Sequence, residues 1–386
     1  MNKPNLVPKT LKVALTLVAT MTGQIGQAAD QIIVASGLAQ PTKLDATRGG
    51  NLIVSETGLE DNDGRLSIVD VSGVRPLLGG LPTGIDLTDG LMGPTAISVV
   101  GCCTVLIGIG EGDTLRNSVT PGEQVPNPVG NVSPLFSSVL KLFVKPSLDR
   151  VYGSFDLTRD DHERLADGEV VRLTSTYDET AFVVMAADIK DFRPDLVTNV
   201  RASQPFGFAR SPKIGRIIAD SGYNALLSLG RFGRTKVELR FDPVANPLPF
   251  GPPVSDYVPT AVRERWGSKS RFLVGNFVGF PFAPGTATVQ EVDLRSGSNT
   301  TLISGLTSIT DLLSLKSGIY VLEFTGNFLE NQPGQLLHFA DPNEPPRVLA
   351  DNLIGPTGLS YVPAENAIYI AERFGGKITR VRIDEH

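Results

Sequence analysis

Six acidic or amide side chains recur along the 386-residue chain where they could bind a cation or a polar ligand. Each follows a Pro-Thr-like dipeptide by 13 to 16 residues. The pairs are Thr42 with Glu56, Thr95 with Glu111, Phe206 with Asp220, Thr260 with Asn276, Thr310 with Glu323, and Thr357 with Glu372. The stretch between the two members reads as an apolar hairpin. A pairing this steady predicts a repeat architecture.

These six residues allow two interpretations. In the structural one, which we favour, a side-chain oxygen at a strand end caps backbone N–H groups of the following turn in every repeat. In the functional one, a subset holds a divalent cation such as Ca²⁺, which prefers carboxylate and carbonyl oxygens. The candidate metal ligands are Asp220, Asn224, Asn276, Asp311 and Glu323.

The segment Asn276–Gly285 (NFVGFPFAPG) combines three Phe with two Pro and predicts a stiff apolar loop. A ligand pocket typically joins such a surface to a few polar groups. The alternative is that the loop plugs a channel mouth or packs on its neighbour. The candidate ligand-binding residues are Phe277, Phe280, Phe282, Glu56, Glu111 and Glu372.

Several chemistries lack the residues that they need. The chain has three His, and none falls at a repeated position, so a Ser-His-Asp triad and a His-rich metal site are disfavoured. No Gly-rich phosphate loop leads from a strand into a helix. The net charge of −6 would repel phosphate backbones, so nucleic acid is not an expected partner.

The first 28 residues are interpreted as a secretory signal. Three Lys precede the apolar stretch Val13–Ala19, and Gly26-Gln27-Ala28 offers small residues where a signal peptidase reads the chain. The alternative is an apolar N-terminal strand. Removing residues 1–28 would change the net charge to −9, because it removes those Lys and no acid. We expect an exported, periplasmic or extracellular protein with no transmembrane segment.

The last repeat indicates the fold. Strands are predicted over Thr357–Val362, Ala367–Ala371 and Lys377–Ile383, and then the chain stops. A four-stranded propeller blade needs one more strand, and the apolar segment Gln31–Ala35 can supply it. Pairing of the two chain ends would close a ring and remove free sheet edges.

The repeats predict an all-β, six-bladed β-propeller as one domain over residues 29–386. The start of blade 3 lies 111 residues after that of blade 2, whereas the other gaps are about 50. That gap holds either long insertions, around 112–135 and 156–203, or a degenerate seventh blade around 169–176 and 180–186. We favour six blades. The charged run Thr158–Asp167 is the best candidate for a helix.

Propeller geometry predicts where a binding face lies. The innermost strand of each blade leaves one rim and the second strand returns to it, so the Pro-Thr dipeptides and the six acidic or amide residues should share a face. Five predicted long connections, 57–64, 112–135, 243–258, 277–285 and 324–334, fall on that rim. Insertions gathered on one face of a ring indicate a binding face.

The only cysteines are the neighbours Cys102 and Cys103. In an exported protein they could form a vicinal disulfide. The alternative, which we favour, is two thiols on one strand, each facing a different side of the sheet.

Several segments together resemble the ScyD/ScyE family of NHL-like propellers. They are Val258-Pro259-Thr260, the loop Phe272–Phe282 with Gly285, Thr310-Asp311-Leu312, Tyr320–Glu323, Pro356–Leu359 and Ile218–Asn224. The resemblance is strongest over about 204–383 and weak over about 112–200. It implies an exported bacterial β-propeller and an association with biosynthesis of the pigment scytonemin.

The leading functional hypothesis is a propeller that binds a small molecule or a partner protein on the loop-rich face. The alternative is a metal-dependent propeller enzyme of the lactonase or hydrolase type. A third class, a pigment-precursor oxidoreductase, is disfavoured by the scarcity of His. The residues do not determine the oligomeric state.

Overall fold

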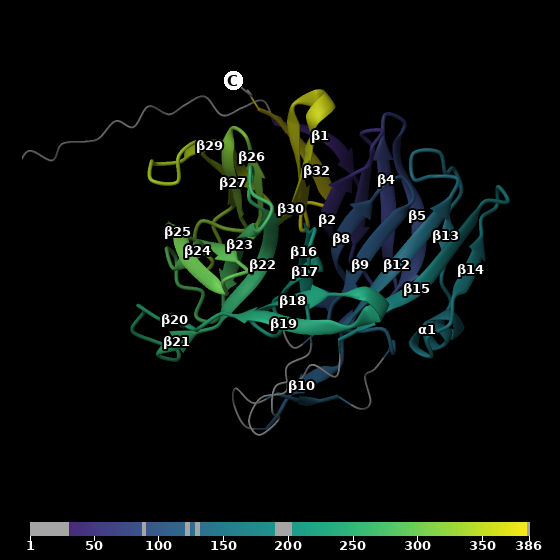
Figure 1. The fold of residues 1–386 in the computed structure, drawn as a ribbon, viewed down its shortest axis with the longest axis horizontal. Coiled ribbons are helices and arrows are strands. Elements are labelled where there is room, and N and C mark those ends of the chain that lie inside the picture. Colours follow the sequence, from purple (N-terminus) through teal and green to yellow (C-terminus); the bar gives the residue numbers. More distant parts are fainter. Residues whose placement is uncertain (1–30, 87–89, 120–123, 128–131, 190–202, 384–386) are drawn as a thin grey trace, which may run out of the picture.

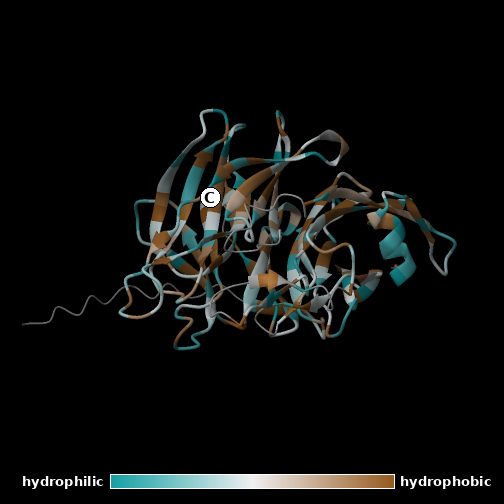
Figure 2. Ribbon diagram, turned by 90° about the horizontal axis from the view of Figure 1, so that it is seen from below, coloured by the Kyte–Doolittle hydropathy of each residue, from teal (hydrophilic) through white to brown (hydrophobic). Residues whose placement is uncertain are grey.

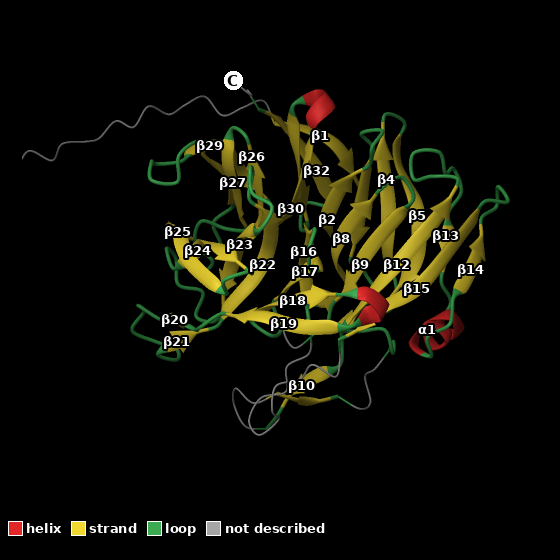
Figure 3. Cartoon of the chain, viewed as in Figure 1, coloured by secondary structure: helices red, strands yellow, loops and turns green. Residues whose placement is uncertain are grey.

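The computed structural model describes residues 31–86, 90–119, 124–127, 132–189 and 203–383. Six sheets of four or five strands surround a central axis, and nearly all of the ordered structure is β (Figures 1 and 3). The predicted all-β, six-bladed propeller is therefore confirmed. The proposed signal, residues 1–28, lies outside the described residues.

Blades 3, 4 and 5 are plain four-stranded meanders in which each strand pairs antiparallel with the next. Blade 3 consists of β16 (Pro205–Ser211), β17 (Gly215–Asp220), β18 (Ala225–Leu229) and β19 (Thr235–Arg240). Blade 4 consists of β22 (Tyr257–Glu264), β23 (Arg271–Val278), β24 (Ala287–Asp293) and β25 (Ser298–Leu306). Blade 5 consists of β26 (Ile309–Leu315), β27 (Gly318–Glu323), β28 (Gly334–Phe339) and β29 (Arg347–Leu353).

Blade 6 is closed by the start of the described chain, as the sequence predicts. It consists of β30 (Pro356–Val362), β31 (Ala367–Glu372), β32 (Lys377–Arg382) and β1 (Gln31–Ser36). Strand β1 pairs antiparallel with β32 from Gln31 opposite Val381 to Ser36 opposite Lys377. In Figure 1 the purple β1 lies beside the yellow β32. This pairing covers an edge that would otherwise be open to other chains.

Blades 1 and 2 each carry a fifth strand. Blade 1 has β2 (Pro41–Ala46), β3 (Leu52–Glu56), β4 (Gly64–Asp70), β5 (Gly73–Leu81) and a short parallel β13 (Phe155–Asp156). Blade 2 has β8 (Pro94–Val100), β9 (Thr104–Ile109), β12 (Ser138–Lys145), β15 (Thr180–Asp188) and β14 (Val171–Thr174). Because β14 and β15 extend blade 2, the segments considered for a seventh blade are its two outermost strands.

The predicted helix is α1 (Arg159–Ala166), and it begins with a capping box between Thr158 and Asp161. His162 and Leu165 are buried against the sheets, so only the opposite side of the helix is solvated. His162 Nε2 donates to the carbonyl of Gly80 at 2.7 Å, because that oxygen can only accept. Nδ1 then accepts from the Ser133 hydroxyl at 3.1 Å, and burial lowers the pKa of His162.

Short elements complete the connections. They are the hairpins β6 (Gly84–Ile85) with β7 (Leu91–Met92), β10 (Leu115–Asn117) with β11 (Gln124–Pro126), and β20 (Val244–Ala245) with β21 (Val254–Ser255), and the 3₁₀ turns η1 (Arg231–Gly233) and η2 (Pro363–Glu365). In the described part of the chain, no helix has the length and apolarity needed to cross a membrane.

The core lies between neighbouring blades. One cluster joins β23, β24 and β26 of blades 4 and 5 through buried side chains such as Leu273, Val289 and Leu312. The strands accordingly carry much of the apolar colour in Figure 2, whereas α1 is largely hydrophilic. Each blade therefore gains stability by burying both faces of its sheet against its two neighbours.

We count each blade from the Pro of its Pro-Thr dipeptide or the residue equivalent to it, which is the first residue of the inner strand in five blades and the third residue, Pro259, in β22. A β-bulge lies directly after this residue in every blade, at the Thr of the dipeptide or its equivalent. Four of these Thr donate a hydrogen bond to the first carbonyl of the next blade, and we call this contact the inter-blade hydrogen bond. The pairs are Thr95 to Pro205 at 2.6 Å, Thr260 to Ile309 at 2.6 Å, Thr310 to Pro356 at 2.9 Å, and Thr357 to Pro41 at 3.3 Å. The dipeptide thus joins neighbouring blades around the axis.

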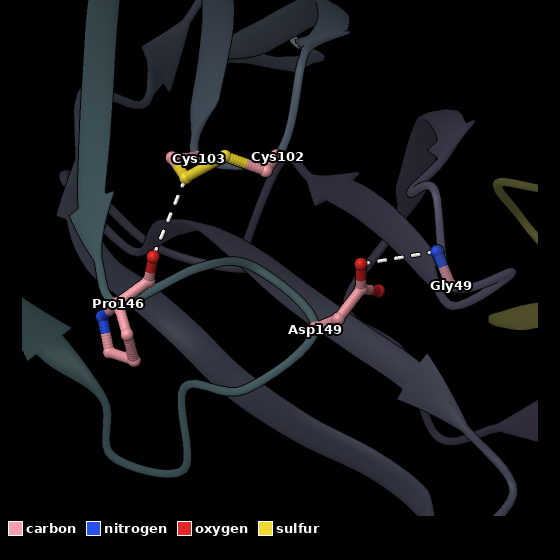
Figure 4. Close-up of a disulfide and its surroundings, with 5 residues drawn as sticks. All are labelled: Gly49, Cys102, Cys103, Pro146 and Asp149. Carbon is pink, nitrogen blue, oxygen red and sulfur yellow. Dashed lines mark hydrogen bonds between the residues drawn. A yellow bond between two sulfur atoms is a disulfide. The ribbon is translucent and has the colours of Figure 1, made fainter.

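Cys102 and Cys103 form a disulfide, so the favoured prediction of two thiols is wrong. The residues occupy the turn between β8 and β9, and they do not point to opposite faces of a strand as that prediction required. Figure 4 shows the bridge beside the loop that carries Pro146 and Asp149. Cys103 Sγ lies 3.5 Å from the carbonyl oxygen of Pro146, and Asp149 accepts from the backbone N–H of Gly49.

We predict that Thr260→Val weakens the ring because it removes one inter-blade hydrogen bond and keeps the side-chain shape. The free energy of unfolding should fall by about 1 kcal/mol, the typical net value of a buried hydrogen bond. Guanidinium unfolding measures this loss. Thr300→Val, at an exposed position of β25, is the control and should change stability little. Equal effects of both substitutions would contradict the role of the inter-blade hydrogen bond.

Candidate functional site

Strand pairing places the six acidic or amide residues at one end of the inner hairpins. In five blades the residue pairs with the first residue of its own blade, as in Pro41 with Glu56 and Pro205 with Asp220. In blade 2 the partner of Pro94 is Ile109, and Glu111 follows two residues later. Glu111 therefore differs from the other five.

Three of the glutamates join the chain that enters a blade to the third strand of the same blade. One carboxylate oxygen of each accepts a backbone N–H two residues before the blade begins. The donors are Ala39 to Glu56 at 2.5 Å, Thr307 to Glu323 at 2.6 Å and Ile354 to Glu372 at 2.7 Å. The other oxygen accepts from the third strand, from Ser67, Gln335 and Thr379 respectively. All three side chains are buried. They bind backbone N–H groups, as the structural interpretation predicts, but these N–H groups precede the blade and do not belong to the turn that follows the second strand.

Asp220 and Asn276 have comparable roles. Asp220 accepts the backbone N–H groups of Gln204 and Tyr223, both at 3.1 Å, and the hydroxyl of Ser203. Burial raises the pKa of Asp220 to about 6. Asn276 Oδ1 accepts the backbone N–H of Thr288 at 2.8 Å, while its buried Nδ2 has no hydrogen-bond partner among the described residues.

Glu111 differs from the other five residues in its pKa as well as in its position. Burial, together with repulsion from Asp86 and Asp220, raises its pKa to about 8. Its own backbone N–H donates to Gln204 Oε1 at 3.2 Å. At neutral pH the carboxyl group is therefore mostly protonated, which is a common property of functional acids and also occurs in structural networks.

The five candidate metal ligands do not lie around one point. Asp220, Asn276 and Glu323 cap three different blades, and Asn224 Nδ2 donates to Asp256 at 2.9 Å. Asp311 lies in the interior at the axis. In the described residues, no group of three or more His, Cys, Asp and Glu side chains is placed to hold a metal ion.

The axis carries a charged network that the sequence did not indicate. Lys43 and Asp311 occupy the second position after the first residue of blades 1 and 5, and their side chains form a buried ion pair at 3.4 Å. Lys43 Nζ also donates to the carbonyl of Thr310 at 2.7 Å and lies 5.0 Å from the ring centre of Phe206. Arg263 of blade 4 binds the same carboxylate at 2.9 Å. We call these four side chains, Lys43, Phe206, Arg263 and Asp311, the axial plug.

Counting from the start of each blade would have found the axial plug. At the same second position the other four blades carry only Ala96, Gly207, Ala261 and Gly358. Charged residues at two such positions therefore stand out against a background of small ones. The isolated segments do not reveal this, because blades 1 and 5 are far apart in sequence.

Six Phe side chains gather on the loop-rich face, and we call them the Phe patch. They come from blades 4, 5 and 6, each from the region that joins the second strand to the third. The ring centres of neighbouring pairs lie 4.5 to 6.4 Å apart. The members are Phe277, Phe280, Phe282, Phe324, Phe328 and Phe374. The first three lie in the loop that the sequence predicts to be apolar, whereas the other three come from blades 5 and 6, which the ring brings beside that loop.

The Phe patch combines packed and exposed rings. Phe277 is partly buried and contacts Phe282, Phe324 and Phe328. Phe280 and Phe374 are 57% and 65% exposed. Phe282 has a backbone φ of 59°, a left-handed conformation that costs energy for a bulky residue. The rings of Phe277, Phe280 and Phe328 pack around the ring of Phe282, so the patch is a continuous apolar surface.

Comparison with known structures supports the fold. A glucose dehydrogenase crystal structure is 12% identical, with 92% of this chain and 100% of that chain covered and a TM-score of 0.51. A streptogramin B lyase is 10% identical, covering 92% and 98%, with a TM-score of 0.48. The PQQ-bound aldose sugar dehydrogenase of Streptomyces coelicolor is 12% identical, covering 92% and 98%, with a TM-score of 0.46. At 12% identity the likeness to the glucose dehydrogenase shows the propeller fold alone.

No family model matches the chain, and no curated protein matches it. Fold and sheet topology therefore define the class to which the chain belongs, the six-bladed β-propellers.

We predict that Glu111→Gln flattens the dependence of stability on pH. The folded protein keeps a proton on Glu111 up to a pKa of about 8, whereas the unfolded chain releases it near 4.5. The folded state thus binds more protons between these values, and the wild type should lose stability as the pH rises through them. Between about pH 6.5 and 8 the loss is about 2 kcal/mol, at about 1.4 kcal/mol per unit.

Guanidinium unfolding at several pH values in this range measures the slope for Glu111→Gln and the wild type. Glu344→Gln, at an exposed glutamate, is the control and should keep the wild-type slope. If Glu111→Gln also keeps that slope, Glu111 does not carry the proton.

Proposed function

We propose that this chain is an exported, ligand-binding β-propeller of the ScyD/ScyE type, whose Phe patch holds an aromatic small molecule. The observation that carries the proposal is the Phe patch itself, six rings from three adjacent blades on the loop-rich face. Its rings are already packed against one another, so a ligand would meet a preformed surface and little ordering would be lost on binding.

The geometry of the rings favours an aromatic ligand. Phe280 meets Phe282 at 88°, and Phe324 meets Phe374 at 78°, so edges and faces of rings are both presented to solvent. Aromatic pairs prefer such edge-to-face or offset arrangements and gain about 0.5–1.5 kcal/mol beyond burial. A planar aromatic molecule could extend this packing by one more ring.

The resemblance to ScyD/ScyE supports the same class of ligand. The segment Phe272–Phe282, one of those that carry the resemblance, also supplies half of the Phe patch. The family name refers to a pigment, and a pigment precursor with fused rings would match the surface. No family model matches the chain, so membership and the link to scytonemin-like biosynthesis stay part of the proposal.

Export to the periplasm or beyond is proposed on two grounds. Residues 1–28 have the charge and apolar pattern of a secretory signal. The bridge between Cys102 and Cys103 suits an oxidising compartment, because cytosolic reductants keep most thiols reduced.

We predict that the double variant Phe280→Ala/Phe374→Ala binds aromatic ligands at least tenfold more weakly than the wild type. Both side chains are largely exposed, so Tm should change by no more than about 1 °C. A panel of indoles, phenols and fused-ring compounds is screened by fluorescence titration or calorimetry to find a binder. A tenfold loss of affinity corresponds to about 1.4 kcal/mol, the scale of one or two lost ring contacts.

Trp266→Ala provides the matched control, because Trp266 is an aromatic residue 59% exposed on the connection between β22 and β23, away from the patch. It should leave the affinity unchanged. If the double variant binds as tightly as the wild type, or if Trp266→Ala weakens binding equally, the patch is not the site. Binding of apolar peptides without any aromatic small molecule would favour a protein partner.

A further inference from the structure

A cavity of about 250 Å³ lies in the central channel on the other side of the axial plug from the Pro-Thr dipeptides. The inner strand of every blade contributes to its wall, and we call it the axial pocket. Its polar side chains are Asp45, Ser98, Arg263, Ser360 and Tyr361. Its walls are otherwise apolar, with Leu44, Phe208 and Leu313 among them.

The position of the polar groups follows from strand geometry. Side chains alternate along a strand, so the second and fourth residues after the start of a blade both point to the axis. The second positions supply the plug residues Lys43 and Asp311. The fourth positions supply Asp45, Ser98, Arg263 and Ser360 to the axial pocket. The pocket is thus formed by side chains of the inner strands and not by loops.

Two opposite charges face each other across this layer. Asp45 is on blade 1 and Arg263 is on blade 4, which are diametrically opposite in a ring of six. Asp45 accepts the backbone N–H of Val99 at 2.7 Å and that of Ala46 at 2.9 Å. Arg263 binds Asp311, and its Nη1 lies 3.3 and 3.5 Å from two backbone carbonyls. Both charged groups are therefore fixed in place, each by partners on its own side.

Neither charge neutralises the other by direct contact. Among the described residues, the ion pair of Arg263 is the one with Asp311, and Asp45 takes part in none within 4 Å. A carboxylate offers about four acceptor sites, and two of those on Asp45 are used. Burial raises the pKa of Asp45, and the backbone N–H of Val99 and the charge of Arg263 oppose this rise.

We propose that the axial pocket binds a small zwitterion of the α-amino acid type, with its ammonium group at Asp45 and its carboxylate at Arg263. A simple anion would meet the repulsion of Asp45, and a simple cation that of Arg263, whereas a zwitterion compensates both. The hydroxyls of Ser98 and Ser360 can satisfy remaining polar atoms, and the apolar wall can hold a short side chain. This site is separate from the Phe patch and does not depend on the proposed function.

Charged groups of blades 3 and 4 lie near the pocket. Arg210 and Arg216 pair directly across β16 and β17, and both interact with Glu264, whereas Arg216 also interacts with Asp45. The positive charge of the two Arg is therefore offset in part by these carboxylates.

The test measures Tm of the full protein with each of the twenty common α-amino acids at millimolar concentration. At least one should raise Tm by about 2 °C or more, because a ligand that binds only the folded state stabilises it. For each amino acid that does so, the methyl ester lacks the carboxylate and the N-acetyl derivative lacks the ammonium group. Neither derivative should raise Tm.

Two variants locate the site. Asp45→Asn should weaken binding of the amino acid at least tenfold, and Asp341→Asn, at an exposed acid, should not. Ser98→Leu fills the pocket without removing a charge and should also abolish binding, which decides the matter if Asp45→Asn does not fold. The proposal is overturned if no amino acid raises Tm, if the ester or the N-acetyl derivative binds equally well, or if folded Asp45→Asn and Ser98→Leu both bind as the wild type does.

Discussion

Six inner strands converge on one axis, and the space between them there determines which side chains the axis can hold. A Cβ on Gly358 would lie 2.9 Å from backbone atoms of Thr42 and Lys43, so that position has no room for a side chain. Four of the six blades have Gly or Ala at this second position. The other two blades can therefore carry long side chains there, and these meet at the axis. Lys43 and Asp311 use that space and close the channel.

The axial plug shows why a charged pair is acceptable at such a place. Burying two charges costs more than their attraction returns unless further hydrogen bonds satisfy them. Here the carboxylate of Asp311 also binds Arg263 and the backbone N–H of Leu359, while Lys43 donates to a carbonyl. Burial and the nearby guanidinium still lower the pKa of Lys43 to about 8, against the effect of Asp311. The plug thus connects blades 1, 4, 5 and 6 at one carboxylate.

The residues that recur in the repeats stabilise the ring, whereas Phe206 and Glu111, which depart from the repeat pattern, have other contacts. Thr recurs because in four blades it donates to the next blade, and Glu recurs because in three blades it binds the third strand of its own blade. Phe206 stands where other blades have Thr, so it cannot form the inter-blade hydrogen bond, and its ring lies near Lys43 instead. Glu111 lies two residues beyond the capping position, and its carboxyl group is the one that burial and nearby charges keep protonated.

The fold was predictable from sequence because the signal is periodic. Spacing between Pro-Thr dipeptides and acids gave the blade number, and the missing last strand required closure by residues 31–36. What could not be predicted depends on contacts between blades. The other half of the Phe patch, Phe324, Phe328 and Phe374, belongs to repeats where nothing local suggests an aromatic surface. Likewise, the turn that brings Cys102 and Cys103 together was mistaken for a strand, because its flanks are strands.

The two proposed sites differ in the part of the molecule on which they depend. The Phe patch belongs to connections outside the sheets, so substitutions there change binding with little effect on the ring. The axial pocket shares Arg263 with the axial plug, and Arg263 can therefore not change for a ligand without changing the contacts of Asp311. A carboxylate that binds Arg263 would compete with Asp311 for the same guanidinium. A ligand of the axial pocket thus has to compete with the ion pair of Arg263 and Asp311, which limits its affinity. A ligand of the Phe patch meets no such competition.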